Sequence, residues 1–193
     1  LLIVSAMMTV LWFVQRWIGN AGIVDPGWAA SIGILGCFYA ITSSGYLPRR
    51  ILVAVLIGTW SMRLAVYLLW DRVLGHPEEG RYRILRAQWG ANAERRLFFF
   101  FQYQAIAALF FSLPILVIAH HPADHWIVWD LVGLLIWCIS VSNTILADRQ
   151  LTRFKQRSES RGKTCREEWW RYSRHPNNFF EWLHWFPKNG GAS

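Results

Sequence analysis

Charged side chains are scarce in this chain of 193 residues, and most of its length is apolar. Lys, Arg, Asp and Glu together make up 17% of the sequence, whereas globular domains average about 25%. Hydrophobic residues make up 54%, and 13 residues are Trp. Too little polar surface remains to cover so much apolar sequence, so the composition excludes a soluble globular protein and favours a membrane protein.

Cysteine is also rare, and the sequence shows neither a signal peptide nor a repeat. Of the three cysteines, Cys37 and Cys138 fall in apolar runs and Cys165 in a basic stretch. This excludes a disulfide framework and fits a reducing or lipid environment. The first residues lack the basic flank and the cleavage site of a signal peptide. No repeat divides the chain, so we predict one membrane domain over residues 1–193.

Several catalytic motifs are missing as well. The sequence contains no G-x-G-x-x-G stretch and no G-x-S-x-G elbow. The run 162–164 resembles the end of a phosphate-binding loop, but Arg157 stands where that loop requires its leading Gly. The one cluster of histidines, in a short loop at 120–125, lacks the convergent spacing of a zinc site, so no metal site is predicted.

Long apolar runs are what the chain has in abundance. A helix needs roughly 20 residues to cross about 30 Å of hydrocarbon, and five runs approach or exceed this length: 1–18, 28–46, 51–70, 97–119 and 126–147. We therefore predict an all-α fold, a polytopic transmembrane helical bundle of about five spans. Pro26 and Gly27 predict a break before the second span, Pro48 its end, and Pro114 a kink in the fourth.

Basic residues gather in two segments that predict the orientation. The segment 120–125 between them contains no Lys or Arg. Because basic loops stay in the cytoplasm, we predict a cytosolic basic rim, with Arg49 and Arg50 as exceptions on the other side. The net charge of +8 is assigned to anionic lipid and a phosphorylated ligand, since no nucleic-acid-binding motif accompanies it. The two segments hold Arg72, Arg81, Arg83, Arg86, Arg95 and Arg96, and then Arg149, Arg153, Lys155, Arg157, Arg161, Lys163, Arg166, Arg171 and Arg174.

Residues 148–157 are predicted to continue the fifth helix beyond the bilayer. Arg149, Arg153 and Arg157 recur there at every fourth position and therefore share one helix face. Two interpretations of this stripe stay open, a contribution to a binding site and a simple positive-inside anchor.

Two charged residues, Arg63 and Asp130, lie within the three longest apolar runs. Arg63 shares a helix face with Tyr67 well inside the third span. Because a charge at such depth is costly, we predict a functional role or a buried ion pair for Arg63. Asp130 lies near the start of the fifth span, where we expect it to cap the helix or reach the outer interface.

The run 171–182 concentrates more chemistry than any other part of the sequence. It places two arginines, a histidine, two asparagines and a carboxylate beside Phe179, Phe180, Trp182 and Trp185. So many polar groups at a membrane edge need a partner, and a bound anion is the natural one. We therefore predict a site for a phosphate-bearing cofactor here.

This run also carries a resemblance to a known family. On residues 146–155, 171–177 and 180–185 the chain resembles the DUF1295 membrane proteins, which are related to the C-terminal domain of steroid 5-alpha-reductases. Earlier stretches, Asp25 with Trp28, 60–64, and 78–82 with Leu85 and Arg86, look like further signatures, so the resemblance spans roughly residues 20–187.

The resemblance implies an NADPH-dependent reductase that acts on an activated carbon–carbon double bond of a lipid-soluble substrate, steroid-like or isoprenoid, in a bacterial inner membrane. Tyr67, Tyr82 and Glu181 are the implied catalytic residues. The implied cofactor-binding residues, which suit phosphate, ribose or carboxamide groups, are Asp148, Arg149, Arg153, Lys155, Arg171, Tyr172, Arg174, His175, Asn177 and Asn178.

Two alternatives stay open. The isoprenylcysteine carboxyl methyltransferases share the Arg-His-Pro turn and bind S-adenosylmethionine. A non-catalytic membrane protein that keeps the fold is the other alternative, because the family usually has Tyr where this chain has Asn178. The family also continues past Trp185, so we expect residues 179–193 to begin a truncated further segment. The oligomeric state stays open, and no nucleic-acid partner is expected.

Overall fold

The computed structural model describes residues 1–157, 163–183 and 185, and the regular elements in these ranges are all helices. The chain divides into two compact units, residues 1–122 and 123–193, which are described separately. The predicted all-α fold is confirmed. The prediction of one domain over the whole chain stays a prediction.

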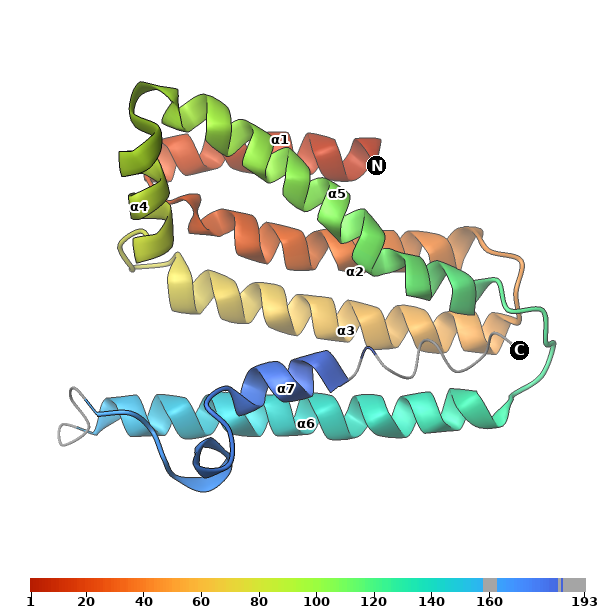
Figure 1. The fold of residues 1–193 in the computed structure, drawn as a ribbon. Helices are drawn as coiled ribbons and strands as arrows, with labels where there is room; N and C mark the ends of the chain where they lie inside the picture. Colours follow the sequence, from red (N-terminus) through yellow and green to blue (C-terminus); the bar gives the residue numbers. More distant parts are fainter. Residues whose placement is uncertain (158–162, 184, 186–193) are drawn as a thin grey trace. The chain divides into compact units, whose positions relative to one another are not determined.

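Unit 1 is a helical bundle in which α2 is the central helix, antiparallel to α3 and running in the same direction as α5 (Figure 1). Helix α2 packs against α3 and α5, and α1 packs against α5. Its elements are α1 (Leu2–Ile18), η1 (Ala21–Ile23), α2 (Val24–Thr42), α3 (Leu47–Arg72), α4 (Gly80–Trp89), η2 (Gly90–Asn92) and α5 (Ala93–Ala119). The short, polar α4 crosses one end of this bundle (Figure 1).

Small residues let α2 approach its neighbours closely. A Cβ added to Gly33 would lie 2.2 Å from Ser61 Oγ of α3, and one added to Gly36 would lie 2.9 Å from Ile57 Cγ2. The Ser61 hydroxyl donates a hydrogen bond to the Ala29 carbonyl over 2.8 Å. Close backbone approach and such hydrogen bonds are what hold helices together in lipid, where the hydrophobic effect between helices is absent.

Two expectations about prolines were wrong. Helix α2 begins at Val24, before Pro26, and ends at Thr42, before Pro48. Pro48 lies in the first turn of α3 instead. The physical reason is that the first turn of a helix has unpaired N–H groups in any case, so proline begins a helix as readily as it interrupts one. Pro114 lies inside α5, which runs unbroken through it.

Unit 2 contains one long helix with two short elements packed on it. These are α6 (Val128–Gln156), η4 (Glu168–Arg171) and α7 (Pro176–Leu183). The predicted extension of the fifth helix is confirmed, since α6 continues to Gln156. The capping role of Asp130 is also confirmed, because its Oδ2 accepts a hydrogen bond from the Ile127 N–H over 3.0 Å.

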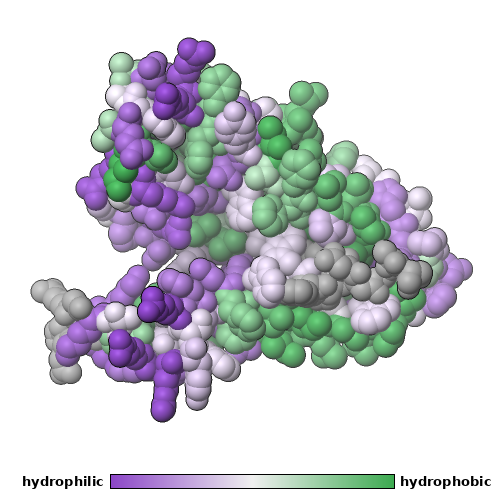
Figure 2. Space-filling view, viewed as in Figure 1, coloured by the Kyte–Doolittle hydropathy of each residue, from purple (hydrophilic) through white to green (hydrophobic). Residues whose placement is uncertain are grey.

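Four segments are long and apolar enough to cross a membrane: Ala21–Thr42, Leu47–Arg72, Gly80–Ala119 and Val128–Gln156. In the third, the apolar part is α5, since α4 carries three arginines. Helix α1 is apolar but shorter, at 17 residues. The protein is therefore an integral membrane protein with a helical bundle. Figure 2 shows hydrophilic residues gathered over α4 and the adjoining helix ends of unit 1, with hydrophobic residues along the helices.

Candidate functional site

The polar end of unit 1 brings together residues that are far apart in the sequence. Asp25, in the first turn of α2, accepts a hydrogen bond on Oδ2 from Arg72 at the end of α3, over 3.0 Å. The same oxygen contacts the guanidinium of Arg81 in α4, and Oδ1 accepts from the Tyr82 hydroxyl over 3.0 Å. Glu79 completes this Asp25 network, with its Oε2 3.2 Å from Arg81 Nε and 3.6 Å from Arg72 Nη1.

Tyr82, one of the three predicted catalytic residues, is the most buried member of the Asp25 network. Its relative exposure is 1%, and the Arg81 guanidinium lies 4.7 Å from its ring centroid. Burial raises the pKa of the Tyr82 hydroxyl, and the negative charge of Asp25 raises this pKa further. The hydroxyl therefore stays protonated and donates to Asp25.

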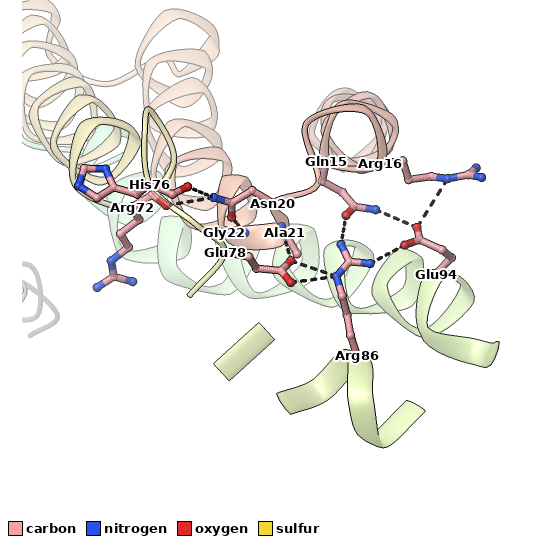
Figure 3. A network of polar contacts seen from close by, with 10 residues as sticks. All are labelled: Gln15, Arg16, Asn20, Ala21, Gly22, Arg72, His76, Glu78, Arg86 and Glu94. Carbon is pink, nitrogen blue, oxygen red and sulfur yellow. Dashed lines mark hydrogen bonds and ion pairs between the residues drawn. The ribbon is translucent and has the colours of Figure 1, made fainter. Parts of the chain in front are cut away.

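A second set of polar contacts surrounds Arg86 of α4 (Figure 3). Its Nε donates to both carboxylate oxygens of Glu78, over 3.0 and 3.1 Å. Its Nη1 donates to Glu94 of α5 over 2.5 Å, and its Nη2 donates to the Gln15 side-chain oxygen of α1 over 2.5 Å. Gln15 in turn donates to the other oxygen of Glu94 over 2.9 Å. Arg16 lies 3.6 Å from Glu94 and closes this Arg86 network.

Side chains of the same region also satisfy the backbone groups at two helix ends. Glu78 Oε1 accepts from the Ala21 N–H over 2.8 Å, at the start of η1. Asn20 accepts from the Gly22 N–H over 2.9 Å and donates to the Arg72 carbonyl over 3.2 Å, at the end of α3 (Figure 3). Helix ends leave such groups unpaired unless side chains or water reach them, so these contacts fix where the helices of unit 1 begin and end.

The charges of the two networks balance within each network. Asp25 and Glu79 face Arg72 and Arg81, and Glu78 and Glu94 face Arg86 and Arg16, so each network contains two carboxylates and two guanidinium groups. A balanced and partly buried set of this kind joins helices together. It leaves little net charge with which to attract an anion.

In unit 2, the predicted cofactor residues form a different arrangement. Asn177 donates from Nδ2 to Asp148 Oδ1 over 3.0 Å, which ties the start of α7 to α6. Asp148 is buried, and its position on α6 is followed by the exposed Arg149. The aromatic residues Trp169 and Trp170 of η4 strengthen the same joint. Trp170 Nε1 donates to the Ala147 carbonyl over 3.0 Å, and Trp169 packs edge-on against Phe180 with ring centroids 5.2 Å apart.

The basic residues around this joint are exposed. Among the residues that the structure describes, none of them forms an ion pair, in contrast to the neighbouring Arg157, which lies 2.9 Å from Glu167. We call the exposed, unpaired set the basic rim: Arg149, Arg153, Lys155, Arg171 and Arg174. The other predicted cofactor residues, Tyr172, His175 and Asn178, are exposed on the same unit.

The structure brings some of the predicted site residues into contact, and others belong to different units. Asp148 and Asn177 contact each other directly. Tyr67 is partly buried in α3 of unit 1, whereas Glu181 is partly buried in α7 of unit 2.

Glu168, at the start of η4, has a φ of 52°, a left-handed conformation that is uncommon for residues other than Gly.

Several polar residues that the structure brings together received no role from the sequence. Gln15 and Glu94 meet Arg86 only in the fold, and Asn20 likewise meets the Arg72 carbonyl there. One signal was present in the sequence, because Asp25, 78–82 and Arg86 all belong to stretches that carry the family resemblance. When charged residues in separated stretches all carry the same family resemblance, we can expect them to contact one another in the fold.

No curated protein and no solved structure is similar enough to this chain to match it. One family model does match, that of a family described as "Protein of unknown function (DUF1295)", and the match extends over residues 11–188. It includes the Asp25 and Arg86 networks as well as the basic rim. Since the match covers most of its length, this membrane protein belongs to the DUF1295 family.

Proposed function

We propose that this protein is a membrane reductase that uses NADPH to reduce an activated carbon–carbon double bond in a lipid-soluble substrate. The observation that carries the proposal is the basic rim, whose five cations are exposed and form no ion pair within the described part of the chain. Arg72, Arg81 and Arg86 of unit 1 already face carboxylates, whereas the cations of the basic rim are available to a bound polyanion. Steroid 5-alpha-reductases, which the chain resembles in its tail motif, perform this class of reaction.

The residues of unit 2 fit a phosphorylated dinucleotide in their chemistry. Arg149, Arg153 and Arg171 offer planar guanidinium groups suited to two-point contacts with phosphate oxygens. Tyr172 and Phe179 are exposed aromatic side chains that could stack on a flat heterocycle. The Asp148–Asn177 pair offers a carboxylate and an amide for sugar hydroxyl groups. The basic rim would therefore hold the phosphates, with the exposed rings beside it.

NADPH, when bound, supplies a hydride for the double bond, and the protein must supply a proton donor and exclude water. Tyr67 and Glu181 are our candidates for that donor. Tyr82 would first have to leave Asp25, and its raised pKa makes it a weaker acid than an ordinary tyrosine. We propose that Tyr82 acts mainly by positioning α4 against α2. The apolar helices would hold the substrate, in keeping with its solubility in lipid.

Cofactor preference tests this proposal most directly. The detergent-solubilised protein is heated with NADPH, NADH, S-adenosylmethionine or no ligand. A ligand at a hundredfold excess over its Kd stabilises the folded state by about 2.7 kcal/mol, so we expect the largest rise in Tm with NADPH. A rise with S-adenosylmethionine alone would assign the protein to the methyltransferase alternative. The absence of any shift would favour the non-catalytic alternative.

We further propose that the basic segments face the cytoplasm of a bacterial inner membrane, on the strength of the positive-inside rule. Single cysteines introduced at Pro77 and Lys163 should then react with an impermeant thiol reagent only from the cytoplasmic side. A cysteine at Ala123 should react only from the outside. Labelling of Ala123 and Lys163 from one side would show that α6 does not cross the membrane, and the proposed orientation would be lost.

A further inference from the structure

One face of α5 combines two features that the proposed reductase activity does not use. At its polar end lie Arg95 and Arg96, both exposed, and neither forms an ion pair among the residues that the structure describes. Together with Asn92 and Phe99 they line an open hollow on the surface of unit 1. The guanidinium of Arg96 lies over the ring of Trp89, 6.0 Å from its centroid, which limits the directions the side chain can take.

Exposed apolar side chains continue from this hollow along the same face of the helix. They follow Phe99 at spacings of four, three and four residues, which keeps them on one side of an α-helix. Their relative exposures are 47% for Phe99, 67% for Tyr103, 41% for Ile106 and 65% for Phe110. The opposite side of α5 is the packed one, since Leu97, Phe101, Ala105 and Ala108 are buried there.

The dimensions of this face match one leaflet of a bilayer. From Phe99 to Phe110 the helix rises about 16 Å, at about 1.5 Å per residue. The hydrocarbon core of a bilayer is about 30 Å thick, so each leaflet contributes about 15 Å. The apolar face therefore has about the length of one acyl chain in a leaflet. Arg95 and Arg96 lie at the end of the face that would be level with the lipid headgroups. Trp89 is close to Arg96 and is of the residue type found at membrane interfaces.

We propose that this face of α5 is a binding site for an anionic phospholipid. Arg95 and Arg96 contact the lipid phosphate, Asn92 contacts the polar headgroup, and one acyl chain lies along Phe99, Tyr103, Ile106 and Phe110. The argument from charge is specific to this place. At this end of unit 1, Arg72, Arg81 and Arg86 already face carboxylates within their networks, whereas Arg95 and Arg96 line the hollow and have no carboxylate partner among the described residues. Arg83 of α4 is exposed too, but it does not line the hollow.

Lipid binding to variants of the full chain tests the proposal. The protein is purified in detergent, and native mass spectrometry follows its titration with phosphatidylglycerol or with phosphatidylcholine. We expect Arg95→Gln and Arg96→Gln each to weaken phosphatidylglycerol binding about fivefold, since a basic residue near an anionic lipid contributes about 1 kcal/mol. Arg83→Gln is the matched control, because Arg83 is exposed on α4 and its loss removes the same charge. It should change the affinity less than about twofold.

Two further arms distinguish a bound phospholipid from a free phosphate ion. Phe110→Ser should weaken binding of long-chain phosphatidylglycerol and leave binding of a short-chain form unchanged, since Phe110 lies about 16 Å beyond Phe99 and only the long chain reaches it. Excess inorganic phosphate should fail to displace the long-chain lipid. Equal effects of Arg83→Gln and Arg96→Gln, or displacement of the lipid by phosphate, would overturn the proposal. All these side chains are exposed, so the variants are expected to fold as the wild type does.

Discussion

The polar end of unit 1 and the basic rim of unit 2 are built from the same residue types and differ in how these are partnered. In unit 1, Arg72, Arg81 and Arg86 each face a carboxylate, and Glu78 and Asp25 are largely shielded from solvent, with side-chain exposures of 8% and 16%. In unit 2, the arginines of the basic rim are exposed and form no ion pair among the described residues, and the buried carboxylate of Asp148 accepts a hydrogen bond from the Asn177 amide.

This difference indicates which arginines hold the structure together and which are available to a ligand. A guanidinium between two carboxylates has its charge neutralised and its donors used, so its removal affects folding first. A solvated guanidinium contributes little to stability, because exposed charges gain little from pairing. It can instead be recruited by a phosphate. Four changes test this distinction, from the largest expected effect on stability to the smallest.

Replacement of Arg86 should have the largest effect. Arg86→Ala leaves Glu78 and Glu94 without their shared cation and Gln15 without its donor. Breaking a buried ion pair costs about 3–5 kcal/mol, and because this network is partly exposed we expect about 2–4 kcal/mol. The measurement is thermal unfolding in detergent. Arg86→Lys, which keeps the charge and loses the forked geometry, should fall in between. A wild-type Tm for Arg86→Ala would remove the structural role given to this network.

Tyr82→Phe should have the next largest effect, since it removes the hydroxyl that donates to Asp25. We expect a loss of about 1–2 kcal/mol in the free energy of unfolding. Because the folded state raises the pKa of this hydroxyl, its contribution is complete below about pH 10, the ordinary tyrosine value, and declines as pH rises beyond it. Unfolding measured across that range should show the decline in the wild type and a smaller one in Tyr82→Phe. Identical pH profiles for the two proteins would contradict the assigned contact.

Asn177→Ala separates a structural contact from a ligand contact in unit 2. Loss of the hydrogen bond to Asp148 should cost about 1 kcal/mol in stability. If Asn177 also binds cofactor, NADPH affinity should fall about fivefold or more. Asn178→Ala is the stability control, because the Asn178 side chain is exposed and should change the free energy of unfolding by no more than about 0.5 kcal/mol. Lower stability with unchanged NADPH affinity would make Asn177 a structural residue, and we would withdraw the cofactor role of this turn.

The smallest change in stability is expected for Arg149→Gln. Its free energy of unfolding should stay within about 0.5 kcal/mol of the wild type. NADPH affinity should fall a few-fold at low salt and less at high salt, because attraction between exposed charges is screened. Arg157→Gln is the matched control, since Arg157 lies directly after the end of α6 and is already paired with Glu167. Equal losses of affinity in the two variants would show that pairing does not distinguish these two arginines.

Much of the fold could be predicted because membrane spans are encoded locally. The apolar runs 51–70 and 97–119 fall within α3 and α5, and the run 126–147 lies in α6 from Val128 onward, since length and hydrophobicity alone are what a bilayer requires. The cap formed by Asp130 and the extension of α6 were also local signals. The ends of α2 were misjudged, because Pro26 and Pro48 are compatible with both the first turn of a helix and a break.

The candidate site was predictable only in part, for a related reason. The sequence by itself determined three features: the apolar helices, the concentration of arginines at their ends, and the polar run 171–182. The tertiary structure alone decided which charges are used up. Gln15, Glu78, Arg86 and Glu94 meet because three helices and a loop converge at one end of unit 1, whereas Arg149 and Arg174 project where no carboxylate of the described chain reaches them. Ion pairing depends on distances of a few ångströms between residues distant in sequence, and only packing sets those distances.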